Sequence, residues 1–167
     1  MARILLIHGA MGGAWCWERV LPGLRAAGHE PVAIDLPGQG ADRTPLPEIT
    51  LAHYADAVSA ALSELEGPVL LAGHSMGGMV ITQAAARHPE KLAGLVYVAA
   101  FLPQPGQSLI DITHQPEAAG DSVQANIVVN AITYALRTIG HIAYGGLVLD
   151  RARRPLLRDS QGEGLCR

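Results

Sequence analysis

The chain has 167 residues, 49% of them hydrophobic, and a formal net charge of −3 at pH 7. This length fits one domain with a sizeable core, and the weak negative charge gives no reason to expect a nucleic acid or an anionic membrane as a partner. No segment approaches ~18 uninterrupted apolar residues, and the first apolar run is too short for a secretory signal, so we expect a cytoplasmic protein. Its two cysteines, Cys16 and Cys166, form no spaced pair, so neither a disulfide nor a metal site is predicted.

Short apolar runs alternate with helical patterns along the first hundred residues. Strands are predicted at 4–7, 32–35, 69–72 and 95–100, and helices at 17–27, 51–65 and 78–87. Pro22 is a difficulty for the first helix unless its first turn is irregular, whereas Thr50 is a good N-cap for the second. The alternation predicts an α/β fold with a mostly parallel sheet covered by helices on both faces, a three-layer α/β/α architecture. Ligands of such sheets bind at the carboxyl ends of the strands.

The most informative segment is Gly73-His74-Ser75-Met76-Gly77, between the third strand and the third helix. It fits the pattern Gly-x-Ser-x-Gly, and a strand before it with a helix after it is the context of a nucleophile elbow. Such a turn presents the Ser75 hydroxyl at the carboxyl end of the strand, above a helix whose dipole favours negative charge. An incidental serine in a Gly-rich turn is the alternative, and the apolar flanks argue against it.

A Gly-rich loop, His8-Gly9-Ala10-Met11-Gly12-Gly13, follows the first strand. A nucleophile elbow needs an oxyanion hole with one backbone N–H after the nucleophile and one from the loop after an earlier strand. We expect Met76 to supply the first N–H and Ala10 the second. A phosphate-binding loop is the alternative, but the glycine spacing matches neither common phosphate-binding pattern. His8 is interpreted as a residue that supports this loop, His74 as a structural residue that packs beside the elbow, and Asp35 as a structural residue that closes a strand.

Three blocks, at 8–17, 35–40 and 73–78, resemble the α/β-hydrolase fold superfamily. Within it they are similar to the branch of plant methylesterases, hydroxynitrile lyases and bacterial esterase-like relatives, from about Arg3 to about Val129. The resemblance implies acyl transfer on a small-molecule ester, in which Ser75 attacks the carbonyl and water releases the acid, with no cofactor or metal. Cleavage of a cyanohydrin is a weaker alternative, because the plant lyases have Thr in place of Gly9.

The carboxyl-terminal part is harder to interpret. We expect residues 1–102 to form the first part of the hydrolase core, and residues 103–167 to hold the start of a helical cap and an Arg-rich tail. The resemblance implies a helical cap that starts with Asp111–Asp121, and the near-helical spacing at 122–138 predicts a helix there. The segment 151–167 has no apolar periodicity and is expected to fray, with a nucleic-acid-binding arm as the alternative.

The acid and the histidine of a catalytic triad follow the serine in this fold. We recognise no late strand followed by Asp and no histidine loop near the terminus, so the last strands of the core are predicted to be missing, as after a frameshift near Val129–Asn130. A chain without a base would be an inactive remnant that at most binds a small carbonyl ligand, and its open sheet edge would favour a homodimer. The histidines after Ser75 are a surface cap, His88, and two conceivable bases, His114 and His141. The carboxylates without a specific signal are Asp111, Asp121, Asp150 and Asp159.

Overall fold

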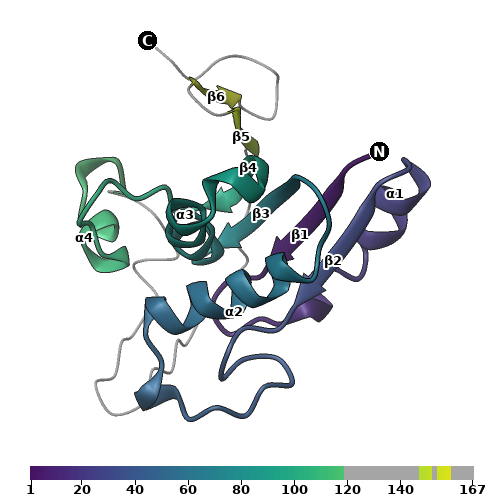
Figure 1. The fold of residues 1–167 in the computed structure, drawn as a ribbon. Helices are drawn as coiled ribbons and strands as arrows, with labels where there is room; N and C mark the ends of the chain where they lie inside the picture. Colours follow the sequence, from purple (N-terminus) through teal and green to yellow (C-terminus); the bar gives the residue numbers. More distant parts are fainter. Residues whose placement is uncertain (119–146, 152–153, 159–167) are drawn as a thin grey trace.

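The computed structural model describes residues 1–118, 147–151 and 154–158. Their strands form one six-stranded sheet in the order β2-β1-β3-β4-β5-β6 (Figure 1). The strands are β1 (Arg3–Ile7), β2 (Glu30–Ile34), β3 (Val69–Ser75), β4 (Leu92–Ala100), β5 (Leu147–Arg151) and β6 (Arg154–Arg158). The first four are parallel, as predicted, whereas β5 and β6 are antiparallel to their neighbours.

The helices are α1 (Leu21–Ala26), α2 (Leu51–Ser63), α3 (Gly77–Arg87) and α4 (Leu109–Thr113). Thr50 caps α2, where its side chain accepts a hydrogen bond from the backbone N–H of His53. The helix predicted at 17–27 is wrong at its start. A separate 3-10 helix, Ala14–Trp17, comes first, and α1 begins late enough to place Pro22 in its first turn, where a missing N–H costs nothing.

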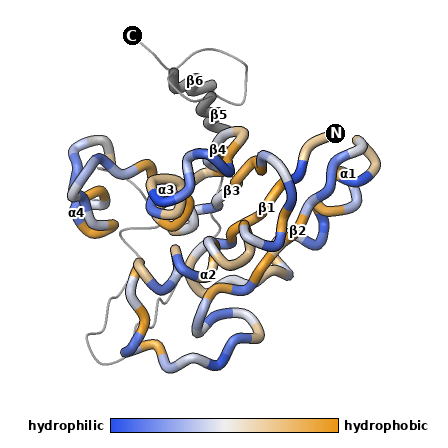
Figure 2. Tube along the Cα trace, viewed as in Figure 1, coloured by the Kyte–Doolittle hydropathy of each residue, from blue (hydrophilic) through white to orange (hydrophobic). Residues whose placement is uncertain are grey.

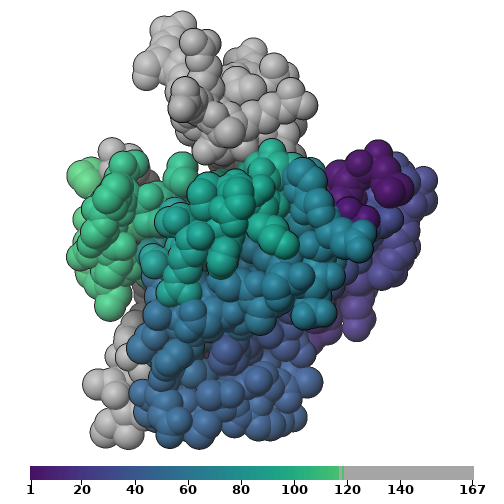
Figure 3. Space-filling model, viewed as in Figure 1, coloured from purple at the N-terminus to yellow at the C-terminus, as the bar shows by residue number. Residues whose placement is uncertain are grey.

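The sheet buries a different core on each face, which confirms the three-layer α/β/α architecture. Leu5 and Ile7 of β1 pack with α2 and α3 on one face, while Ile4 and Leu6 pack on the other face with Trp17 and residues of α1. The alternation follows from the two-residue period of a strand. Apolar residues dominate β1 in Figure 2. In Figure 3, α2 and α3 cover the front of the sheet, and the start of the chain (purple) is visible only at the right margin.

Helix α3 approaches the sheet more closely than side chains would allow. A Cβ atom added to Gly77 would lie 2.8 Å from the carbonyl oxygen of His8, after β1. One added to Gly78 would overlap the carbonyl oxygen of Phe101, after β4. Glycines therefore let the start of α3 pack directly on the backbone at the carboxyl ends of both strands.

The carboxyl-terminal strands correct one prediction. The segment 151–167 was expected to fray, but Arg154–Arg158 form β6, which pairs with β5. Strand β5 was not recognised either. Both strands are only five residues long, which is too short for a clear periodic signal in the sequence. The helix predicted at 122–138 lies outside the described residues.

Candidate active site

Ser75 is the last residue of β3 and stands at the turn into α3. Its φ angle is +52°, a left-handed conformation that non-glycine residues adopt only when the surroundings enforce it. A Cβ at Gly73 would lie 2.6 Å from the carbonyl oxygen of Gly77, so this strand-to-helix turn can close so tightly only with a glycine two residues before the serine. The strand–turn–helix arrangement predicted around Ser75 is therefore present, with its side chain half-buried.

The Gly-rich loop after β1 lies against this serine. A Cβ added to Gly9 would be 2.9 Å from the Cβ of Ser75. The loop turns back because the N–H of Gly12 donates to the carbonyl of Gly9 at 3.2 Å, with Met11 at a φ of +57°. The structure thus brings together Ser75, the peptide group that carries the Ala10 N–H, and Met76 at the N-cap of α3. These are the three residues that the sequence predicts for the site.

His8 is fully buried behind this loop and joins two strand ends. Its Nδ1 lies 2.7 Å from the carbonyl oxygen of Gly9, and its Nε2 lies 3.1 Å from the backbone nitrogen of Leu36. Because a carbonyl only accepts and a backbone N–H only donates, the imidazole carries its proton on Nδ1 and is neutral. Burial lowers the pKa of His8, which favours the same neutral form.

Asp35 holds the far side of the same loop, as predicted for a structural residue. Its carboxylate accepts hydrogen bonds from the backbone N–H groups of Ala14 at 2.6 Å and Ala41 at 3.0 Å. These two bonds, with that of Ala14 the stronger influence, hold the pKa of Asp35 below its usual value. The N–H of Gly40 also donates to the carbonyl of Gly12 at 3.0 Å, so the segments after β1 and β2 are tied together.

His74 packs beside the elbow, as its place in the motif predicts. Its ring meets Trp17 edge to face, with ring centroids 6.4 Å apart and an interplanar angle of 89°. Burial lowers the pKa of His74, and the nearby His8 acts in the same direction. No sequence pattern indicated Trp17 as a neighbour of the elbow, because the two residues come from distant segments that only the folded sheet brings together.

The structure places some of the candidate acids and bases on later elements of the chain. His88 is the C-cap of α3, and His114 is the C-cap of α4, where its Nδ1 donates to the carbonyl of Ile110 at 2.9 Å. Asp150 in β5 pairs with Leu95, away from the strand end where Ser75 lies. Within residues 1–118, no histidine or carboxylate is hydrogen-bonded to the Ser75 hydroxyl. His141, Asp121 and Asp159 fall outside the described residues.

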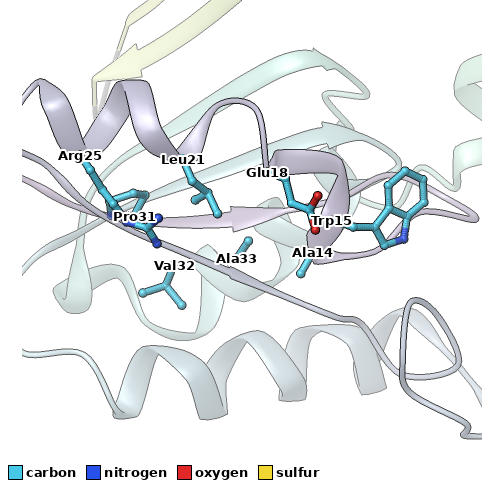
Figure 4. Close-up of a pocket in the computed structure, with 8 residues that line it drawn as sticks. All are labelled: Ala14, Trp15, Glu18, Leu21, Arg25, Pro31, Val32 and Ala33. Atoms are coloured by element: carbon cyan, nitrogen blue, oxygen red, sulfur yellow. The ribbon is translucent and has the colours of Figure 1, made fainter.

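A shallow depression of about 370 Å³ lies between α1 and β2 (Figure 4). It does not include Ser75, Ala10 or Met76. Its lining residues are Ala14, Trp15, Glu18, Leu21, Arg25, Pro31, Val32 and Ala33.

In the part of the chain that the structure describes, no helix is long and apolar enough to cross a membrane, and no cluster of side chains could hold a metal ion.

The imidazoles of His8 and His74 predict how stability depends on pH. The pKa values of His8 and His74 are lowered in the folded protein, so between these values and the unfolded value near 6.5 the unfolded chain binds more protons. Their contribution is complete above about pH 6.5 and is lost as the pH falls below it. The ionised Asp35 nearby opposes the shift in His8 without reversing it.

We therefore expect the free energy of unfolding, and with it the urea midpoint, to fall between pH 7.5 and pH 5.5. Below about pH 6.5 the free energy falls by at most about 1.4 kcal/mol per pH unit for each such histidine. Circular dichroism during urea titration measures it. A midpoint that rises on acidification would contradict the lowered pKa values of His8 and His74.

Comparison with known proteins places this geometry in a family. The model of the alpha/beta hydrolase family matches residues 4–163, and the chain belongs to that family. It is 44% identical over 105 residues to Methylesterase 7 of Arabidopsis thaliana, covering 60% of this chain and 40% of the relative. It is 41% identical to a pyrethroid hydrolase of Sphingobium wenxiniae, covering 62% of this chain and 37% of the relative.

Solved structures agree with the fold. The crystal structure of polyneuridine aldehyde esterase has a TM-score of 0.67 at 28% identity, covering 91% of this chain and 58% of the other. That of an Arabidopsis methylesterase has a TM-score of 0.60 at 33% identity, covering 64% and 47%. The chain spans about two fifths of the length of the curated relatives it matches and about half of the length of the structures.

Proposed function

We propose that the protein hydrolyses small carboxylic esters through an acyl-enzyme formed on Ser75. The observation that carries the proposal is the left-handed Ser75 at the β3–α3 turn, with the Gly9–Ala10 peptide packed against it. The relatives whose names describe them as a methylesterase and a pyrethroid hydrolase support an ester as the substrate.

In the proposed reaction the Ser75 oxygen attacks the ester carbonyl and gives its proton to a general base. The N–H groups of Ala10 and Met76 stabilise the oxyanion, each worth roughly 2.7–4 kcal/mol in a preorganised site. Collapse expels the alcohol, which takes the proton from the base, and water then releases the acid by the same steps. This chemistry needs no metal or cofactor. His114 and His141 remain the candidates for the base, because an unassisted serine is a weak nucleophile.

Gly9 argues against the cyanohydrin lyase. The plant lyases have Thr at this place, and here a Cβ would already be 2.9 Å from the Cβ of Ser75. A threonine would therefore displace the serine in this packing. The proposed ester hydrolysis does not need a threonine in place of Gly9.

We further propose that residues 1–102 are the first part of the hydrolase core and that residues 103–167 hold the start of the cap and an Arg-rich tail. Ser108 and Asp111 form a capping box at the start of α4, which gives the cap segment a defined first helix. A cytoplasmic location and a homodimer formed through an open sheet edge stay proposals, and size-exclusion chromatography with light scattering tests the dimer.

Labelling with a fluorophosphonate probe tests the proposed function. We expect one probe per chain by intact mass, and peptide mapping should place it on Ser75. Protein unfolded in urea is the control, because an unactivated serine does not react. A folded protein that takes up no probe would contradict the proposal and would indicate a chain that at most binds carbonyl ligands. Cyanide release from mandelonitrile would instead indicate the lyase.

A further inference from the structure

The proposed reaction uses the N–H of Ala10 but leaves open what holds it in place. The carbonyl of Gly9 and the N–H of Ala10 belong to the same peptide group, which is planar and trans. In a trans peptide these two bonds point in opposite directions. Whatever fixes the Gly9 carbonyl therefore fixes the direction of the Ala10 N–H.

Two donors hold that carbonyl. The Nδ1–H of His8 lies 2.7 Å from its oxygen, and the N–H of Gly12 lies 3.2 Å from it. The His8 bond is the shorter and is fully buried. Donation to a carbonyl also polarises the N–H at the other end of the peptide group, which makes that N–H a stronger donor.

The imidazole is itself fixed from the opposite side. Its Nε2 accepts the N–H of Leu36 at 3.1 Å, directly after Asp35. Asp35 in turn accepts from Ala14 and Ala41 at the ends of both loops. A ring held at both nitrogens cannot rotate, so the end of β2 determines where the imidazole places its Nδ1–H.

We propose that His8 is a positioning residue that directs the Ala10 N–H toward the oxyanion by holding the Gly9 carbonyl. The proposal rests on the proposed function, since it assigns a purpose to the oxyanion hole of that reaction. His8 itself contacts neither the substrate nor the Ser75 oxygen in this reaction. Its effect is transmitted through one peptide group.

Two substitutions separate the bonds of His8. In His8→Asn the side-chain amide reaches about as far as Nδ1 and keeps a donor for Gly9, but it loses the acceptor for Leu36. In His8→Gln the amide reaches about as far as Nε2 and keeps the acceptor, but it loses the donor for Gly9. Both remove the imidazole, so a merely structural role predicts similar effects.

We expect His8→Gln to lower the maximal rate of Ser75 labelling by about 10- to 100-fold with little change in the probe concentration at half-maximal rate, as for a misplaced oxyanion donor. His8→Asn should lower the rate less. The order parameter of the Ala10 amide, from ¹⁵N relaxation, should fall in His8→Gln and stay closer to the wild-type value in His8→Asn. Equal rates for both variants, or an unchanged Ala10 amide in His8→Gln, would overturn the proposal.

The NMR measurement keeps the two proposals distinguishable. If wild-type protein is not labelled at all, the proposed function fails, while the Ala10 amide still decides whether His8 positions the peptide. If His8→Gln does not fold, the ¹⁵N chemical shifts of His8 in the wild-type protein show which ring nitrogen carries the proton, and this result tests the proposal instead. A proton on Nδ1 is expected, and a proton on Nε2 would overturn the proposal.

Discussion

Ser75→Gly is expected to abolish probe labelling and to be more stable than Ser75→Ala by about 1 kcal/mol. Both variants lack the hydroxyl, and removing the nucleophile of a comparable serine hydrolase lowers kcat by about 10⁶. They differ only in the Cβ, which is strained at the φ of +52° that this residue adopts. Glycine adopts that conformation without strain. The site would then be one where stability is sacrificed for a reactive geometry.

Urea denaturation of the two variants, followed by circular dichroism, measures the difference. The unfolding free energy of the wild-type protein, compared with that of Ser75→Ala, shows how far the interactions of the serine hydroxyl offset the strain. Equal stability of the alanine and glycine variants would mean that the turn is not strained. Labelling that survives in either variant would mean that another residue is the nucleophile.

Gly9→Ala is expected to lower the Ser75 labelling rate about 100-fold, as for a displacement near 1 Å at a reacting group. The added methyl group would lie 2.9 Å from the Cβ of Ser75 and 3.1 Å from Nδ1 of His74. Neither neighbour can move freely, because the elbow is packed against β1 and β4. We also expect a loss of about 1–3 kcal/mol in unfolding free energy, which is usual for overpacking a core.

Gly23→Ala is the matched control for this substitution. Gly23 lies in α1, and an added Cβ would meet nothing within 4 Å. Alanine should therefore stabilise the helix by up to about 1 kcal/mol and leave the labelling rate unchanged. The same change from glycine to alanine is thus expected to lower the unfolding free energy at Gly9 and to raise it at Gly23. A Gly9→Ala variant that labels at the wild-type rate would contradict the close packing of the loop on Ser75.

The parts of the site that could be predicted are those set by neighbouring residues in the chain. A strand, a glycine turn and a helix follow one another around Ser75, so a local pattern suffices to place them. The loop at Ala10 was predictable for the same reason. The roles of His8 and Asp35 as supports were inferred, but their partners Leu36 and Ala14 depend on how β1 and β2 pair, which no local pattern specifies.

Other elements could not be predicted because tertiary packing decides them. The first helix was expected at 17–27, but Trp17 packs in the core against β1, and α1 starts only at Leu21. Strands β5 and β6 are short, and the pairing of β5 with β4 and of β6 with β5 sets their conformation rather than their own composition. A base for Ser75 would likewise come from a distant segment.

Strand β1 has one consequence for how the site is acquired. It lies between β2 and β3, and Ile7 pairs with both Ile34 and Gly73. The pairing of β1 with β2 closes a short loop of chain. The pairing of β1 with β3 closes a loop that contains all residues between β1 and the elbow, and its contacts must offset a larger loss of chain entropy. Pairings so distant along the chain form slowly. A growing polypeptide therefore completes its Gly-rich loop early and gains a serine beside it only when β3 inserts next to β1, so that the proposed site forms late and in a single step.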